Sequence, residues 1–282
     1  MTGKKRIVYI FLPVLLISFI FFAGYFREIT NMLRSSSSNF NYVFFGNYYL
    51  CKPESSANTG TDTKYPLLVF LHGSGNGADI SYLDYAGYTR KGLPPSKAAT
   101  SFLSAHPSFV LVPLTEGSWN TEVLVRLIEK TIRTYPIDQK RIYVIGYSMG
   151  GPATYSLANS MHESNGRLFA GIVRLTGQSQ TRLDGAIVMH TRIWLHQGLL
   201  DLPIRMETTR QAYSFLKNAY QGETEIQSEG YIEGHKMLTS SLVVGGKELV
   251  KKTEYPDIGH DIVKLPFVNG DVIEWLFSQS LP

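Results

Sequence analysis

The stretch "IYVIGYSMGG", residues 142–151, joins an apolar run to a glycine-rich segment. It contains Gly146-Tyr147-Ser148-Met149-Gly150, which fits the pattern G-x-S-x-G. The apolar run predicts a buried strand, and "GGPATYSLANSMH" after it predicts a helix. On such a tight strand-to-helix turn, a serine is held in a strained backbone conformation with its hydroxyl exposed above the sheet. We therefore predict that Ser148 is a nucleophile; the alternative is a serine that only caps a helix.

Segments of two kinds alternate from residue 41 onward. Residues 121–134 repeat apolar side chains at helical spacing, and "GDVIEWLFSQ" predicts a closing helix. Continuous apolar runs between the helices predict buried strands, as in "PLLVFLHG", "SFVLVPL" and "TRIWLHQG". This alternation predicts an α/β fold over residues 41–282, with a mostly parallel sheet and helices on both faces.

Two further side chains fit the order nucleophile, acid, histidine that accompanies this motif. Asp201 follows a predicted strand in "IWLHQGLLDLP", and His260 lies in "EYPDIGHDI", between the last strand and the last helix. Loops at the carboxyl ends of parallel strands carry functional groups. We therefore predict that His260 is a general base oriented by Asp201. The competing side chains, which fit this order less well, are Asp184, Asp257, Asp261, His162, His190, His196 and His235.

The loop after "LLVFLHG" allows two interpretations. Residues 73–78, "GSGNGA", fit the G-x-G-x-x-[G/A] pattern of a dinucleotide site. Such a site also needs an acidic residue about 20 positions later, where this chain reads "RKGLPPSKAA". The loop is better interpreted as half of an oxyanion hole, and we predict no nucleotide. Its donors would be the amides of Ser74 and Met149. The predicted substrate pocket comprises His72, Gly73, Trp119 and Tyr147.

The amino-terminal region has a different composition. Residues 7–26 carry no charge and follow the basic residues Lys4, Lys5 and Arg6. Twenty helical residues span about 30 Å, the thickness of a bilayer's hydrocarbon core. We expect a cytoplasmic basic segment (1–6), a transmembrane signal-anchor (7–26), a linker (27–40) and a domain outside the cytoplasm, on the periplasmic or extracellular side. A cleaved signal peptide, which would leave a secreted protein, is the alternative.

Charge and composition exclude several partners. Four of the 27 basic residues but only one of the 23 acidic residues lie within residues 1–30, so the rest of the chain is close to neutral. A neutral body gives no electrostatic reason to expect nucleic acid. No histidine or cysteine pair has the spacing of metal ligands. We therefore predict no metal and no organic cofactor.

Several of these segments resemble the α/β-hydrolase superfamily. They are "PLLVFLHGSG", "DQKRIYVIGYSMGG", "HQGLLDLP", "YPDIGHD" and "VIEWLFSQ". More narrowly, residues 41–282 are similar to small serine esterases of the phospholipase/carboxylesterase, polyhydroxybutyrate-depolymerase-like and feruloyl-esterase-like groups, many of them labelled predicted peptidases. One departure is His196-Gln197-Gly198, where the family usually has His-Gly before the acid.

The resemblance implies a serine-hydrolase fold with Ser148, Asp201 and His260 in the triad positions. Together with the expected anchor, this predicts a membrane-tethered serine hydrolase that cleaves small carboxylic esters through an acyl-enzyme. Two alternatives stay open. The same triad could serve a serine peptidase or amidase, because ester and amide cleavage share this chemistry. The fold could also be reused as a catalytically inactive binding module.

Overall fold

The computed structural model describes residues 41–44, 48–53, 63–74, 106–115, 117–179, 181–220 and 223–282. The strands are β1 (Asn41–Phe44), β2 (Tyr48–Lys52), β3 (Tyr65–Leu71), β4 (Phe109–Pro113), β5 (Ile137–Tyr147), β6 (Gly171–Leu175), β7 (Arg192–Gly198), β8 (Thr224–Ile232), β9 (His235–Val244) and β10 (Lys247–Tyr255). The helices are α4 (Thr121–Thr134), α5 (Gly150–Asn165), α6 (Gly185–His190), α7 (Pro203–Ala219), the 3₁₀ turn η2 (Leu265–Phe267) and α8 (Asp271–Phe277).

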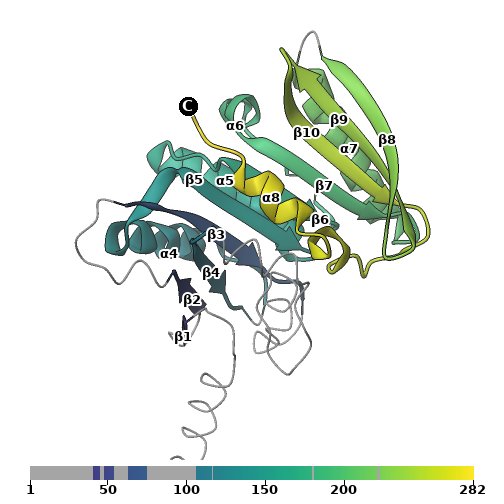
Figure 1. Cartoon of the computed structure of the whole chain (residues 1–282). Coiled ribbons are helices and arrows are strands. Elements are labelled where there is room, and N and C mark those ends of the chain that lie inside the picture. Colours follow the sequence, from purple (N-terminus) through teal and green to yellow (C-terminus); the bar gives the residue numbers. More distant parts are fainter. Residues whose placement is uncertain are drawn as a thin grey trace, which may run out of the picture. The chain divides into compact units, whose positions relative to one another are not determined.

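The described strands form one sheet in the order β1-β2-β4-β3-β5-β6-β7-β10-β9-β8 (Figure 1). From β4 to β10 each neighbouring pair is parallel. The two ends of the sheet, β1-β2-β4 and β10-β9-β8, are antiparallel. Strands β3, β4 and β6 are buried along their whole length, as expected for parallel strands that are covered on both faces.

Each face of the sheet has its own core. On one face, apolar side chains of the strands pack against α4, α5, α6 and α7, including Leu124, Leu157, Ile187 and Leu216. On the other face they pack against η2 and α8, including Phe267, Ile273 and Leu276. Figure 1 shows α8 crossing the sheet on the face opposite α5. The prediction of an α/β fold with helices on both faces is confirmed.

The sheet departs from the prediction at one end. It is mixed, because residues 224–244 form the antiparallel strands β8 and β9 beyond β10, where the sequence predicted no strand. Most of β8 is exposed or half-buried, so it lacks the apolar periodicity from which strands are predicted. The two-residue turn Gly245-Gly246, with φ of 57° and 78°, is a hairpin signal that could have indicated the β9–β10 pair.

The predictions for the amino-terminal region concern residues that the structure does not describe. Residues 1–6, 7–26 and 27–40 all lie outside the described ranges. In the part of the chain that the structure describes, no helix is both long and apolar enough to cross a membrane.

Candidate active site

Ser148 occupies the turn between β5 and α5. Its φ is 54°, in the left-handed region that non-glycine residues rarely adopt. The Ser148 amide donates to the Leu175 carbonyl at 3.0 Å, which fixes the turn against β6. At Gly150 an added Cβ would lie 2.1 Å from the Leu71 carbonyl oxygen, so only glycine allows α5 to begin this close to β3. The turn therefore has the strained geometry that the G-x-S-x-G motif predicted.

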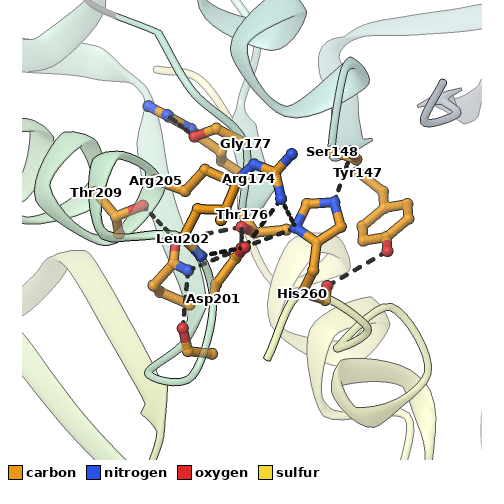
Figure 2. Close-up of polar contacts among 12 residues, drawn as sticks. Tyr147, Ser148, Arg174, Thr176, Gly177, Asp201, Leu202, Arg205, Thr209 and His260 are labelled. Carbon is orange, nitrogen blue, oxygen red and sulfur yellow. Dashed lines mark hydrogen bonds and ion pairs between the residues drawn. The ribbon is translucent and has the colours of Figure 1, made fainter. Parts of the chain in front are cut away.

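The structure brings Ser148, His260 and Asp201 together from three separate segments (Figure 2). His260 Nε2 lies 2.8 Å from Ser148 Oγ, and His260 Nδ1 lies 2.8 Å from Asp201 Oδ2. Asp201 can only accept while ionised, so Nδ1 carries the imidazole proton and Nε2 is free to accept from the serine. The three side chains form a continuous hydrogen-bonded chain.

Tyr147 holds the segment that carries His260. Its hydroxyl donates to the His260 carbonyl at 3.3 Å, and its ring lies 5.5 Å from the imidazole at an interplanar angle of 33°. Tyr147 is buried. Tyr147 was predicted to line the substrate pocket; in the structure it contacts the His260 ring and the His260 carbonyl.

Asp201 is surrounded by hydrogen-bond donors. Its Oδ1 accepts from the Leu202 amide at 2.7 Å and from Arg205 Nη1 at 2.9 Å. Its Oδ2 accepts from Thr176 Oγ1 at 2.7 Å, beside the bond from His260 (Figure 2). Burial acts to raise the pKa of the Asp201 carboxyl, but hydrogen bonds from His260, Thr176, the Leu202 amide and Arg205 outweigh it and hold the pKa well below its usual range. Asp201 is therefore ionised at neutral pH.

Arg205 approaches both His260 and Asp201. Its Nη1 lies 3.0 Å from His260 Nδ1 as well as 2.9 Å from Asp201 Oδ1. Guanidinium nitrogens only donate, so Arg205 can bond the imidazole nitrogen only when that nitrogen carries no proton. While Nδ1 donates to Asp201, Arg205 also donates to the Asp201 carboxylate. His260 and Arg205 therefore share one carboxylate as their acceptor.

The loop after β3 lies against the serine. A Cβ added at Gly73 would lie 3.1 Å from Ser148 Cβ, so a side chain there would crowd the serine. Ser74, the next residue, is exposed. Met149 is the N-cap residue of α5, where backbone N–H groups lack intrahelical partners. These positions are compatible with the predicted oxyanion hole, whose two amides remain a prediction.

His72 and Trp119 contact each other beside this loop. The His72 ring donates from Nδ1 to the Gly73 carbonyl at 2.7 Å and accepts from the Thr115 amide at Nε2, at 3.2 Å. Trp119 donates to the His72 carbonyl at 3.2 Å, and the two ring centroids lie 4.7 Å apart. Both side chains thus brace the backbone that leads to Gly73 and Ser74. Their predicted role in substrate binding remains a prediction.

The competing side chains have other partners. Asp184 caps α6 by accepting from the Ala186 amide, and Asp257 pairs with His235 at 2.9 Å. His196 is buried, with its Nδ1 3.0 Å from the Tyr255 hydroxyl. Within the described ranges, no group of His, Cys, Asp or Glu side chains could hold a metal ion.

Solved structures of known enzymes resemble this arrangement. A thermostable esterase is 24% identical to this chain, with a TM-score of 0.58. The match covers 88% of this chain and 64% of the esterase. The chain has the α/β-hydrolase fold. An acetyl xylan esterase from Aspergillus awamori is 15% identical with a TM-score of 0.51, covering 84% of this chain and 98% of its own. An acylaminoacyl peptidase complex is 15% identical with a TM-score of 0.50, covering 86% of this chain and 42% of its own.

The likeness is one of fold. No protein-family model matches the sequence, and a search of curated proteins found no match. This chain spans less than two thirds of the thermostable esterase, at 64% of its length. In the α/β-hydrolase fold a nucleophile sits on the turn between a central strand and the next helix, which is the place of Ser148 between β5 and α5.

The sequence analysis did not identify several residues that contact Asp201. Thr176 follows β6 with a φ of 52°, unusual for a β-branched residue. Gln197 Nε2 lies 3.3 Å from Asp201 Oδ2, while its Oε1 accepts from Thr209 Oγ1 at 2.8 Å. The residue that departs from the family pattern before Asp201 is thus used to hold Asp201. No catalytic motif marks Thr176, and Gln197 was marked only by its departure from the family pattern.

Proposed function

We propose that this chain is a carboxylic ester hydrolase that works through an acyl-enzyme on Ser148. The observation that carries the proposal is the pair of 2.8 Å contacts that His260 makes, one to Ser148 and one to Asp201. A serine hydroxyl is a weak nucleophile unless a positioned base takes its proton. The strained turn at Ser148 and the α/β-hydrolase fold give further support.

The proposed reaction has two symmetrical halves. Ser148 Oγ attacks the ester carbonyl carbon as its proton moves to His260 Nε2. The alcohol leaves with that proton, and the acyl group stays on Ser148 as an ester. Water then attacks the acyl-enzyme, again giving its proton to His260, and the acid is released. Asp201 keeps Nδ1 protonated and stabilises the imidazolium that forms in each half.

In this proposal the developing oxyanion is bound by the amides of Met149 and Ser74. The close approach of Gly73 to Ser148 Cβ supports the assignment, because Ser74 is the next residue along the chain. Loss of one such donor typically lowers kcat by about 10²- to 10³-fold. None of these steps uses a metal or an organic cofactor.

Ester specificity can be tested by comparing how fast the chain hydrolyses an ester and the matching amide. We expect the full chain to hydrolyse p-nitrophenyl acetate with a kcat/KM at least about 10²-fold above that for the matched p-nitroacetanilide. The acetyl group and the nitrophenyl ring are the same, so the two substrates differ only in the leaving atom, which is oxygen in the ester and nitrogen in the anilide. A higher kcat/KM for the anilide would replace the esterase proposal with an amidase or peptidase. The Ser148→Ala variant measures the background for both substrates.

We also propose that residues 7–26 anchor the chain in a membrane with residues 41–282 outside the cytoplasm. The support is the uncharged run after Lys4, Lys5 and Arg6. A carboxy-terminally tagged chain expressed in its host should remain full-length and stay with membranes after a high-salt wash. A band shorter by about 2–3 kDa that salt releases from the membranes would instead show a cleaved signal peptide.

A further inference from the structure

A groove of about 390 Å³ lies on the α8 face of the sheet. Its size is that of a small-molecule site. The added strands β8 and β9 form one wall, and η2 and α8 form the other. Both ends of the segment that carries His260 reach it, through Tyr255 and Pro266. The groove is lined by Trp194, His196, Ser228, Ile232, Met237, Thr239, Lys251, Thr253, Tyr255, Pro266, Asp271, Val272, Glu274 and Trp275.

The floor of the groove is a bonded array of aromatic and polar side chains. Trp194 donates to Thr253 Oγ1 at 3.0 Å, and its ring stacks on His196 with centroids 4.7 Å apart. Trp275 meets Trp194 edge to face at 5.3 Å and donates to Glu248 at 3.0 Å. These bonds fix both indoles before any ligand arrives, which lowers the entropy cost of binding.

One polar atom of the floor has no partner. His196 Nδ1 pairs with the Tyr255 hydroxyl at 3.0 Å, but His196 Nε2 is buried with no hydrogen bond among the described residues. Burial, and then the charge of Lys251, lower the pKa of His196 to about 3, so the ring is neutral. A buried ring nitrogen without a partner costs free energy, so the floor beneath the groove is not wholly apolar.

The rim of the groove offers both acceptors and a donor. Asp271 and Glu274 are exposed, lie three residues apart on α8 and form no ion pair within the described part of the chain. Lys251 Nζ lies 4.3 Å from the centroid of the Trp194 ring and 3.6 Å from Glu248 Oε1. Carboxylates accept hydrogen bonds and ammonium groups donate them, so the rim can satisfy a ligand that does both.

We propose that this groove binds a neutral sugar ring, such as one residue of an oligosaccharide. Sugar hydroxyls both donate and accept, which suits Asp271, Glu274 and Lys251 together, and the apolar C–H face of the ring suits Trp275 and Met237. An anion would meet two carboxylates, and a cation would meet Lys251. A wholly apolar ligand would make no use of the polar groups Asp271, Glu274 and Lys251 that line the groove. The site is independent of the proposed hydrolysis.

Tryptophan fluorescence of the full chain tests the proposal directly, because two of its three tryptophans line the groove. The probes are xylotriose, cellotriose and mannotriose, each titrated to about 10 mM, with choline as a cationic comparison. We expect at least one trisaccharide to change the emission with a Kd of about 1 mM or below, and choline to leave it unchanged. The same change should persist in Trp119→Phe, which removes the tryptophan outside the groove.

Substitutions in the groove test whether the fluorescence change comes from binding at this site. Asp271→Asn combined with Glu274→Gln changes only exposed side chains and should raise the Kd about tenfold. Trp275→Ala should abolish binding, with circular dichroism and thermal unfolding as checks on its fold. The matched control, Glu163→Gln, removes an exposed carboxylate on α5, on the other face of the sheet, and should bind normally. The proposal is overturned if no trisaccharide binds, if choline alone binds, or if the Asp271/Glu274 variant binds as tightly as the control.

Discussion

Replacing Ser148 with alanine is expected to lower kcat for p-nitrophenyl acetate by about 10⁴- to 10⁶-fold. Without Oγ no acyl-enzyme forms, and only the oxyanion donors and substrate binding remain to assist attack by water. The fold should persist, because alanine at a φ of 54° carries about the same backbone strain as serine. Steady-state kinetics and circular dichroism measure the two quantities.

A fluorophosphonate probe gives an independent readout of the same residue. Such probes phosphonylate a serine, with loss of fluoride, only where nucleophile, base and oxyanion donors act together. The unmodified chain should be labelled and Ser148→Ala should not. Ser164→Ala is the matched control, since Ser164 is an exposed serine at the far end of α5 whose hydroxyl bonds the Ser160 carbonyl. If Ser148→Ala keeps more than a tenth of the activity, the nucleophile is another residue; if the unmodified chain is unlabelled and inactive, the chain is a binding module.

The site residues that could be predicted from the sequence are those marked by a short motif or by their place directly after a predicted strand. Ser148 could be predicted because its turn demands a glycine-rich pattern at fixed spacing. Asp201 and His260 could be predicted because parallel strands deliver their following loops to one edge of the sheet. Their convergence in space depends on the whole fold, in which Nε2 and Nδ1 of His260 each lie 2.8 Å from a partner atom.

The residues that were not predicted are identified only by the contacts that they make in the fold. Thr176 bonds Asp201 from the end of the neighbouring strand β6, and Gln197 bonds it from the end of β7, four residues before it. Arg205 looks like an ordinary residue in the first turn of α7. Strands β8 and β9 were missed for a related reason: a largely exposed strand has no buried face to impose alternation. The groove that these strands help to form therefore had no sequence signal.

Asp201→Asn should lower kcat by about 10⁴-fold with little change in fold. The asparagine has the same shape but presents an NH₂ group, and its carbonyl oxygen can serve only some of the donors that now converge on the carboxylate. If the NH₂ donates to His260 Nδ1, the imidazole proton moves to Nε2, where it faces Ser148. In that tautomer His260 cannot accept the serine proton. The measurement is kcat for p-nitrophenyl acetate, with fluorophosphonate labelling slowed in parallel.

Arg205 is the reason to expect the full effect in this chain. Its Nη1 lies 3.0 Å from His260 Nδ1 and loses its anionic partner when Asp201 becomes neutral. The guanidinium can then donate to Nδ1 as well, which further favours the tautomer that carries its proton on Nε2. Asp184→Asn is the matched control, because asparagine caps a helix as well as aspartate does and Asp184 caps α6; its kcat should be unchanged. A loss of less than tenfold in Asp201→Asn would mean that another group orients the imidazole.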